Sequence, residues 1–186
     1  MSQPESPSPA SSGSASASPE ATAAVALIRV KGENPEYLVL RRAINPKDPW
    51  SGHFALPGGR REPGDPDLLG TCIRETFEEC GVRLERSHLV RPLPLAIAGN
   101  HMGIPMAVAP FLFEMPERPE VRLDEREIAE AHWLPQDYLR DPANRLMAPM
   151  SDKHPQVSFP CIKVADGSGA IWGFTFGVLE TFWESH

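Results

Sequence analysis

Two short apolar runs open the patterned part of the chain. Residues 23–30 read AAVALIRV, residues 37–42 read YLVLRR, and the polar segment KGENPE separates them. Apolar runs of this length, joined by a segment that contains Gly and Pro, predict a β-hairpin. The next segment, INPKDPWSGH, contains Pro46 and Pro49, which lack the backbone N–H that a regular strand uses, so we expect a loop there.

Strand and helix patterns alternate through the rest of the chain. Residues 54–59 (FALPGG) predict a strand end, and residues 66–80 (PDLLGTCIRETFEEC) predict a helix that Gly81 closes. Apolar segments predict strands at 89–99 and 104–115, a strand that turns into a short helix at 128–141, and a C-terminal helix within 169–186. Strands interleaved with helices in this way predict an α/β fold with a mixed sheet.

Composition divides the chain into a tail and a domain. Residues 1–22 are almost wholly Ser, Pro, Ala and Gly, and they cannot bury enough apolar surface to offset their ordering entropy. We therefore expect a disordered tail at 1–22 and one domain at 23–186, a length suited to a single core. The tail contains Glu5 and Glu20 but no Lys or Arg, unlike a secretory or transit peptide, so we expect a cytoplasmic protein.

Charge and cysteine content argue against several classes of partner. The formal net charge of -7 disfavours broad binding to nucleic acid, which relies on many Lys and Arg residues. No apolar run is long enough to cross a bilayer, so we expect no membrane partner. Cys72, Cys80 and Cys161 lack the CxxC spacing of a zinc site, which favours buried thiols in a reducing compartment.

The helix expected at 66–80 carries a cluster of acids. At about 100° per residue, Glu75, Glu78 and Glu79 lie within an arc of about 100°. We expect an apolar opposite face made of Leu69, Ile73, Phe77 and Cys80. A solvated acidic face is the simplest interpretation. The PGG just upstream favours another, because a tight glycine turn brings backbone carbonyls toward the carboxylates, and converging oxygens suit Mg²⁺ or Mn²⁺.

The same segment resembles the Nudix hydrolase signature, G-x5-E-x7-R-E-U-x-E-E-x-G-U, in which U is a bulky aliphatic residue. The matching positions are Gly59, Asp65, Arg74, Glu75, Glu78, Glu79, Gly81 and Val82. The sequence departs from the signature in having Asp65 for Glu, one extra residue before Arg74, and Thr76 at the first U position. The resemblance implies a Nudix fold over residues 23–186, in which a mixed β-sheet is sandwiched between α-helices.

The resemblance also implies a reaction and roles for residues. The family hydrolyses the diphosphate bond of a nucleoside diphosphate linked to another group, with Mg²⁺ or Mn²⁺, and dimers are common in it. By resemblance, the metal ligands are Glu75, Glu78, Glu79 and the carbonyl of Gly58, and Arg74 orients an acid of the helix. The general base is either Glu75 or an acid later in the chain. Glu127 is the candidate among the later acids, and a plain surface role is the alternative for it. A nucleotide sensor that has lost catalysis is the alternative, although such sensors usually lack one of the helix acids.

A further similarity narrows the substrate. The segments LVLRRA, WSGHFALPGGRREPGD and GAIWGFTFGVLETF are similar to those of the coenzyme A diphosphatases of this family, which implies coenzyme A or an acyl derivative as the substrate. Trp50, His53 and Ala55 depart from the pattern of that group. ADP-ribose, NADH and nucleoside triphosphates therefore stay open as alternative substrates.

Several residues outside the helix are candidates for contact with the substrate. Trp50 and His53 could form a platform for the ligand, or Trp50 could cap the core. Arg41 and Arg42 end a strand, and we expect one to bind phosphate and the other to be solvated. His101 lies in the loop GNHMG between two expected strands. We expect Trp133, Trp172 and Cys80 to pack in the core and Cys72 to lie near the acids.

Overall fold

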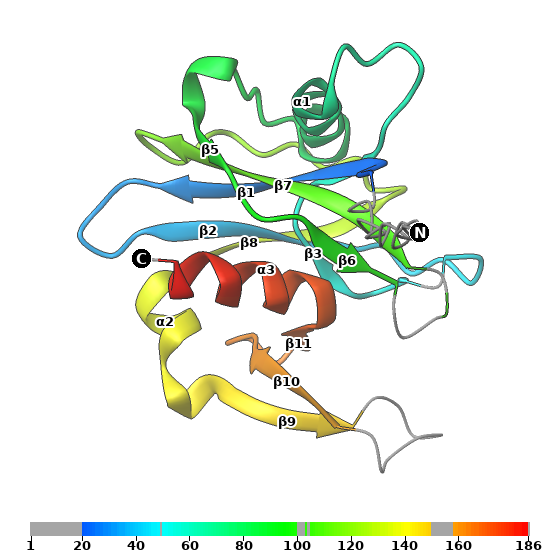
Figure 1. Cartoon of the computed structure of the whole chain (residues 1–186). Helices are drawn as coiled ribbons and strands as arrows, with labels where there is room; N and C mark the ends of the chain where they lie inside the picture. The colour runs from blue at the N-terminus through cyan, green and yellow to red at the C-terminus, as the bar shows by residue number, and fades with distance from the viewer. Residues whose placement is uncertain (1–19, 49, 100–102, 104, 150–157, 186) are drawn as a thin grey trace, which may run out of the picture.

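The computed structural model describes residues 20–185, apart from Pro49, residues 100–102, Ile104 and residues 150–157. The greater part of the expected tail, residues 1–19, and the candidate His101 lie outside the described residues. The described part is layered (Figure 1): α1 covers one face of a large sheet, α3 covers the other, and a small sheet lies beyond α3.

The large sheet is mixed, as expected. Its described strands are β1 (Ala23–Val30), β2 (Glu36–Arg42), β3 (Phe54–Ala55), β4 (Gly58–Arg60), β5 (Leu89–Pro92), β6 (Ala96–Ala98), β7 (Met106–Met115) and β8 (Ile128–Pro135). β1 pairs with β7 in parallel, and the remaining pairs are antiparallel, with the path β3-β2-β1-β7-β5. β8 pairs with β2, and β6 pairs with β7. The expected hairpin of β1 and β2 is confirmed, and the segment 89–99 forms two short strands rather than one.

The strand β4 joins the sheet where β1 begins. β1 pairs with β2 at the hairpin end, through Arg29 opposite Tyr37, and with β4 at its other end, through Val25 opposite Gly58. Gly58 has a φ of 143°, and a Cβ there would lie 2.2 Å from the carbonyl oxygen of Ala24. Only glycine fits this close approach of two backbones. The PGG segment is therefore fixed in the sheet directly beside α1, with which β4 is in contact.

The helix α1 (Leu68–Cys80) has defined ends. The Asp67 side chain caps its first turn by accepting from the Gly70 N–H at 2.6 Å, and Gly81 ends it with a φ of 70°. The core between α1 and the sheet includes Ile28, Leu40 and Cys80. No helix among the described residues has the length and apolar character needed to cross a membrane.

The apolar face expected for α1 is partly wrong. Phe77 is 44% exposed, and the Arg83 guanidinium lies 4.5 Å from the centre of its ring. Cys72 lies near the acids as expected, since the charges of Glu79 and Glu75 add to burial in raising the pKa of its thiol, but it is fully buried, and so is Thr76. Thr76 can be buried because its hydroxyl donates to the Cys72 carbonyl at 2.7 Å, which leaves no unsatisfied polar group.

The second face of the large sheet packs against α3 (Gly173–Glu184) and α2 (Gln136–Arg140), around Leu27, Val39 and Leu179. Short 3-10 turns, η1 (Arg86–His88) and η3 (Pro142–Asn144), precede β5 and follow α2. The strand that turns into a helix after Pro135 and the C-terminal helix are both confirmed.

A second sheet of β9 (Arg145–Pro149), β10 (Ser158–Lys163) and β11 (Ala170–Trp172) was not anticipated from the sequence. It is antiparallel, with β10 between β9 and β11. Arg145 of β9 pairs with Glu180 of α3 through two contacts of 2.8 Å. The small sheet is therefore attached to the helix that closes the main domain (Figure 1).

Candidate active site

Arg74 holds the loop before α1 against the helix. Its Nε lies 2.8 Å from Oδ1 of Asp65, and its Nη2 lies 3.0 Å from Oδ2. Asp65 also accepts from the Thr71 hydroxyl and the Glu62 N–H, each at 2.9 Å. The hydrogen bonds from Arg74 are the main reason why the pKa of Asp65 lies well below its usual range. Asp65, which stands where the signature has Glu, therefore pairs with Arg74, a contact that was not anticipated from the sequence.

The same guanidinium reaches two acids of the helix. It lies 3.0 Å from Oε1 of Glu75 and 2.8 Å from Oε2 of Glu78. The expected role of Arg74, to orient an acid of the helix, agrees with these contacts. Since three carboxylates share one guanidinium, Arg74 neutralises only part of their charge.

Glu79 is the most buried of the helix acids, with 5% exposure. Its Oε2 accepts from the Gly58 N–H at 2.9 Å, and its Oε1 lies 3.9 Å from Nη1 of Arg42. Burial outweighs these favourable contacts and raises the pKa of Glu79 to about 7. This contact also places Gly58 at the site, while the metal-binding role of its carbonyl stays a prediction.

Glu75 lies against the second glycine of the PGG segment. A Cβ on Gly59 would lie 2.6 Å from the Glu75 carboxylate carbon, so this acid occupies the space left by the missing side chain. Burial raises the pKa of Glu75, and the charges of Glu78 and Glu127 raise it further. The charge of Glu127 also raises the pKa of Glu79, so Glu127 acts electrostatically on both buried acids.

The donor set of this cluster fits a hard divalent cation. It consists of carboxylate oxygens, of which those of Glu75 and Glu79 are largely removed from water. The nearby cations Arg74 and Arg42 are shared with Asp65 and Asp48 respectively. The raised pKa values of Glu75 and Glu79 show that negative charge is left without sufficient compensation. Glu78 is more than half exposed and lies at the outer edge of the cluster.

Another group of potential ligands lies between the two sheets. Ligand atoms of Glu130, His132 and Asp166 lie within 4.8 Å of one another, so the group could also hold a metal ion. The His132 Nε2 lies 2.9 Å from Glu130, and its Nδ1 lies 3.7 Å from Asp166. The two ring nitrogens face different carboxylates, so these contacts also account for the arrangement without a metal ion.

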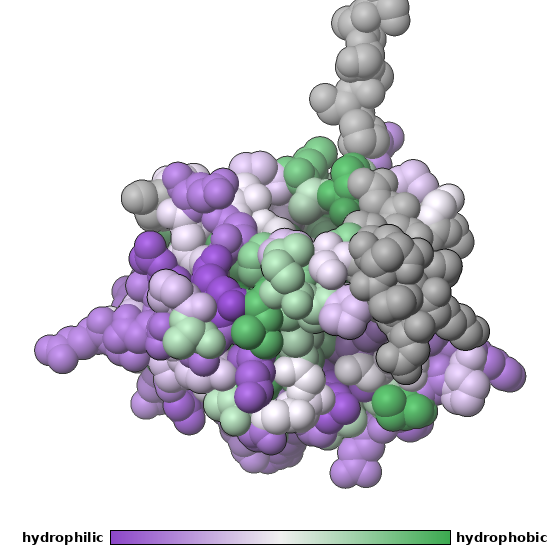
Figure 2. Space-filling view, turned by 90° about the horizontal axis from the view of Figure 1, so that it is seen from below, coloured by the Kyte–Doolittle hydropathy of each residue, from purple (hydrophilic) through white to green (hydrophobic). Residues whose placement is uncertain are grey.

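A cleft of about 830 Å³ lies beside the PGG segment, and none of the α1 acids is part of its lining. Gly58 and Gly59 line it, together with the cationic side chains of Arg42 and Arg60. The rest of its lining is mainly apolar and includes Phe54, Leu56, Leu95, Ile97, Met106, Phe159, Trp172, Phe174 and Phe176. On the side where the small sheet lies, Figure 2 shows hydrophobic residues gathered in the middle of the face and bordered by hydrophilic ones.

The candidate substrate residues divide between the cleft and its surroundings. Arg42, Trp50 and His53 line the cleft. Arg42 is fixed by Asp48, at 2.8 Å, whereas Arg41 pairs with Glu130 at 2.9 Å, lies 5.9 Å from the centre of the Phe54 ring and is not part of the cleft lining. Of the two arginines, Arg42 is therefore the one that lines the cleft, while its binding of a phosphate stays a prediction.

The two tryptophans expected in the core have different surroundings. Trp133 packs against the core beneath α1, as expected. Trp172 lines the cleft and a smaller neighbouring cavity of about 250 Å³, so the core interpretation does not describe it. Its position in a short apolar strand gave no sign of this, because the strand belongs to the unexpected small sheet.

Sequence reasoning also missed residues that support the site. Asp48 fixes Arg42, and Thr71 fixes Asp65, both through hydrogen bonds of side chains. Phe159 and Trp172 line the cleft from β10 and β11. Thr71 lies four residues after the Asp67 cap, and this spacing was a weak local sign that it lies near the start of α1. The positions of Phe159 and Trp172 depend on segments that are distant in sequence.

Comparison with known proteins decides the family. Residues 19–154 match the model of the NUDIX domain. The chain belongs to the Nudix family. A solved MutT/nudix family protein from Enterococcus faecalis shares the fold of this Nudix chain, with a TM-score of 0.63 at 14% identity. That likeness covers 90% of this chain and 62% of the other.

Curated relatives are more similar in sequence. An uncharacterized protein of Schizosaccharomyces pombe, C14C4.10c, is 38% identical over 105 residues, which are 54% of this chain and 32% of that protein. The human mitochondrial coenzyme A diphosphatase NUDT8 is 26% identical over 160 residues, which are 84% of this chain and 64% of that protein. The chain thus spans about a third of the yeast protein and just under two thirds of the human one.

Proposed function

We propose that this chain is a metal-dependent hydrolase that cleaves the diphosphate bond of a nucleoside diphosphate derivative, with coenzyme A or an acyl-coenzyme A as the substrate. One observation carries the proposal: the buried carboxylates of Glu79 and Glu75 meet Gly58 and Gly59, and the same two glycines line the large cleft. A negatively charged diphosphate in this cleft would meet Arg42 and Arg60 beside the glycines that contact the acids.

The reaction is the attack of water on one phosphorus of the diphosphate. A new P–O bond forms, the bond from that phosphorus to the bridging oxygen breaks, and the bridging oxygen leaves with the second phosphate. Bound Mg²⁺ or Mn²⁺ would screen the phosphate charge and acidify water. Glu75, Glu78 and Glu79 would hold the ion, and Arg74 would keep Glu75 and Glu78 in place.

A carboxylate must accept the proton of the attacking water. Glu75 is the first candidate, because its raised pKa brings it closer to neutrality, where a general base is most effective. Glu127 is the second candidate, because its charge acts on both Glu75 and Glu79. Arg42, held by Asp48, would bind the phosphate that leaves or the one attacked.

The cleft supports the choice of substrate. Its volume of about 830 Å³ lies within the range of about 300–1,000 Å³ that is usual for small-molecule sites. Its mainly apolar lining suits the uncharged pantetheine arm of coenzyme A better than a compact, highly charged triphosphate. The similarity to NUDT8, named as a coenzyme A diphosphatase, points the same way. The expected homodimer and cytoplasmic location stay predictions.

A panel of substrates with Mg²⁺ or Mn²⁺ tests the proposal: coenzyme A, acetyl-coenzyme A, ADP-ribose, NADH, diadenosine polyphosphates and nucleoside triphosphates. Release of 3′,5′-ADP from the coenzyme A compounds, absent for Glu79→Gln, is the expected result. Cleavage of another diphosphate would contradict coenzyme A as the substrate and support the proposed hydrolysis of a diphosphate bond. Binding of nucleotides without cleavage of any would favour a sensor, although this chain keeps all three helix acids.

A further inference from the structure

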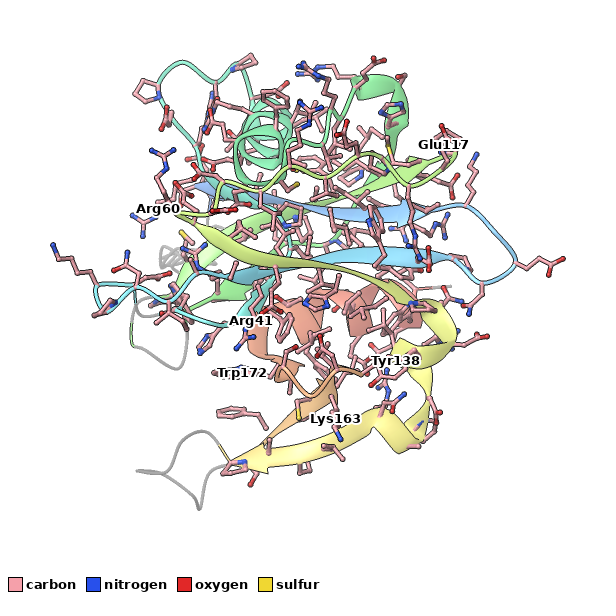
Figure 3. All side chains as sticks on the ribbon, turned by 180° about the vertical axis from the view of Figure 1, so that it is seen from behind. Arg41, Arg60, Glu117, Tyr138, Lys163 and Trp172 are labelled. Carbon is pink, nitrogen blue, oxygen red and sulfur yellow. The ribbon has the colours of Figure 1, made fainter. Side chains whose placement is uncertain are left out.

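His132 lies where the large sheet meets the small one. It is on β8, and its side chain is only 17% exposed. Glu130 precedes it by two residues and therefore lies on the same face of the strand. Asp166 comes from the turn between β10 and β11 of the small sheet. Figure 3 shows this side of the molecule, with Arg41 beside the large sheet and Lys163 on the small one.

Glu130 determines which nitrogen of the His132 ring carries the hydrogen. Its Oε1 accepts from Nη1 of Arg41 at 2.9 Å, and its Oε2 lies 2.9 Å from Nε2 of His132. An ionised carboxylate can only accept hydrogen bonds, so the hydrogen must be on Nε2. The neutral ring then has its lone pair on Nδ1. The Phe54 ring meets the imidazole edge to face at 5.5 Å and restricts its rotation.

The lone pair of Nδ1 faces a second carboxylate across a longer distance. Nδ1 lies 3.7 Å from Oδ2 of Asp166, whereas an N–H···O hydrogen bond spans about 2.7–3.2 Å. Bonds from Zn²⁺ to imidazole nitrogen and carboxylate oxygen measure about 2.0–2.2 Å, so two ligands of one ion lie up to about 4.2 Å apart. The spacing of Nδ1 and Oδ2 therefore fits an ion between them better than a direct hydrogen bond.

Asp166 is suited to act as an ionised ligand. Its Oδ1 accepts from the Ser168 N–H at 2.8 Å, which leaves Oδ2 to face His132. Hydrogen bonds from the side chain and backbone of Ser168 hold the pKa of Asp166 below its usual value. Within the described part of the chain, Asp166 forms its ion pair with His132 rather than with a lysine or arginine. Its charge is therefore less fully compensated than that of Glu130, which Arg41 neutralises.

We propose that Nδ1 of His132 and the carboxylate of Asp166 bind Zn²⁺, with Glu130 as the outer partner that orients the imidazole. Imidazole nitrogen and carboxylate oxygen are both ordinary ligands of this ion. A carboxylate on the other ring nitrogen is the usual companion of a metal-binding histidine. The site is separate from the acids of α1 and does not depend on the proposed function.

An ion at this site would join the small sheet to the large one. Asp166 is presented on a closed turn, in which the Val164 N–H donates to the Gly169 carbonyl at 2.9 Å. A link from this turn to β8 would supplement the ion pair of Arg145 and Glu180, which attaches the small sheet to α3. The site is therefore structural, and Zn²⁺ should stabilise the folded chain because only that state brings the ligands together.

Calorimetric titration of Zn²⁺ into the full chain, freed of metal beforehand, tests the site. The titration uses Glu75→Gln/Glu79→Gln as the background, so that the acids of α1 do not compete for the ion. This background should bind one Zn²⁺ per chain. His132→Gln and Asp166→Asn should each weaken binding by about 10-fold or more, since even the loss of an outer partner of a ligand costs about 10- to 100-fold.

His88→Gln is the matched control for the loss of an imidazole. His88 lies on η1, where its Nδ1 accepts from the Glu85 N–H at 3.1 Å. Its replacement should change the Zn²⁺ affinity by less than about twofold. Thermal unfolding gives a second readout: Zn²⁺ should raise the unfolding midpoint of the background and of His88→Gln, and should not raise that of Asp166→Asn.

The NMR signals of the histidine rings locate the ion directly. Co²⁺ in place of Zn²⁺ should broaden the ring signal that is missing in His132→Gln, and should leave the signal that is missing in His88→Gln sharp. Absence of Zn²⁺ binding by the background would overturn the site. Equal binding by the background, His132→Gln and Asp166→Asn would overturn it as well and reduce the contact to an ion pair of a protonated ring.

These outcomes separate the zinc site from the proposed function. If the natural chain cleaves no diphosphate but Zn²⁺ binds through His132, the hydrolase fails and the zinc site stands. If the natural chain cleaves a diphosphate and the His132 and Asp166 variants bind Zn²⁺ as their background does, the zinc site fails and the hydrolase stands.

Discussion

The acids of α1 differ in environment although they are neighbours in sequence. Glu78 is more than half exposed and paired with Arg74, whereas Glu79 is nearly inaccessible and meets a backbone N–H. Glu75 lies between these extremes, against Gly59. The sequence predicted the cluster, but helical spacing alone could not rank the burial of its members, because burial depends on how β4 lies beside α1.

Two single substitutions distinguish the two candidates for the general base, Glu75 and Glu127. Glu75→Gln should lower kcat by about 100-fold or more, since it removes both a proton acceptor and an oxygen ligand. Glu127→Gln should lower kcat by less than about tenfold, because Glu127 acts on the buried acids through its charge. Steady-state kinetics at saturating Mn²⁺, with the diphosphate that the natural chain cleaves as the substrate, measures kcat of both variants. If Glu127→Gln lowers kcat more than Glu75→Gln does, Glu127 rather than Glu75 is the general base.

Arg74 should not tolerate replacement by another cation. Arg74→Lys keeps the charge but loses the planar fork that contacts Asp65 through two nitrogens. We expect activity to fall by about 10- to 100-fold, as for other groups that position ligands. The control is Arg86→Lys, whose exposed pair with Asp67 lies at the start of α1. Both variants are compared by kcat/KM and by thermal unfolding, and equal behaviour of the two would contradict the positioning role.

At the scale of elements, the site depends on β4 lying against β1. Gly58→Ala should unfold or strongly destabilise the domain, by about 3 kcal/mol or more, because its Cβ would lie 2.2 Å from the Ala24 carbonyl oxygen. Gly64→Ala is the matched control, since a Cβ there meets nothing within 4 Å. Urea unfolding of the two variants compares them directly. A Gly58→Ala protein as stable as Gly64→Ala would show that β4 can shift away from β1.

Local sequence signals predicted the elements around the site, whereas the strands that form by pairing of distant segments were not predicted. The hairpin of β1 and β2, the ends of α1 at Asp67 and Gly81, and the helix after Pro135 follow from nearby residues. The small sheet does not, because β9 and β10 are short, contain Pro149 and Pro160, and pair across a segment that gave no hairpin signal. Missing this sheet led to the wrong environment for Trp172.

Charge links the fold of the whole molecule to its proposed reaction. The chain has a formal net charge of -7, and its buried acids contact Gly58 and Gly59, which line a cleft together with Arg42 and Arg60. Burying Glu79 without a full counter-charge costs stability, which a bound divalent cation would recover. Stability and activity should therefore depend on the same ion.

The pH dependence of unfolding measures this link. In the unfolded chain Glu79 loses its proton near its ordinary pKa of 4.5, whereas in the metal-free native state it keeps the proton up to about pH 7. Between these values the native state binds more protons, so rising pH should lower the free energy of unfolding, by at most about 3 kcal/mol for this group. Urea unfolding in EDTA from pH 5 to pH 8 should show the decline, and saturating Mn²⁺ should remove it by favouring the ionised acid.

Glu79→Gln isolates the contribution of this one carboxyl. The variant has no proton to release, and its amide oxygen can still accept from the Gly58 N–H, so its metal-free stability should change much less over the same pH range. A variant with the same decline as the natural chain would place the titration on another group, with Glu75 the next candidate because burial raises its pKa too. If Glu79→Gln loses both the fall in unfolding free energy with pH and the stabilisation by Mn²⁺, the carboxyl group that destabilises the metal-free protein is also the group that binds the ion.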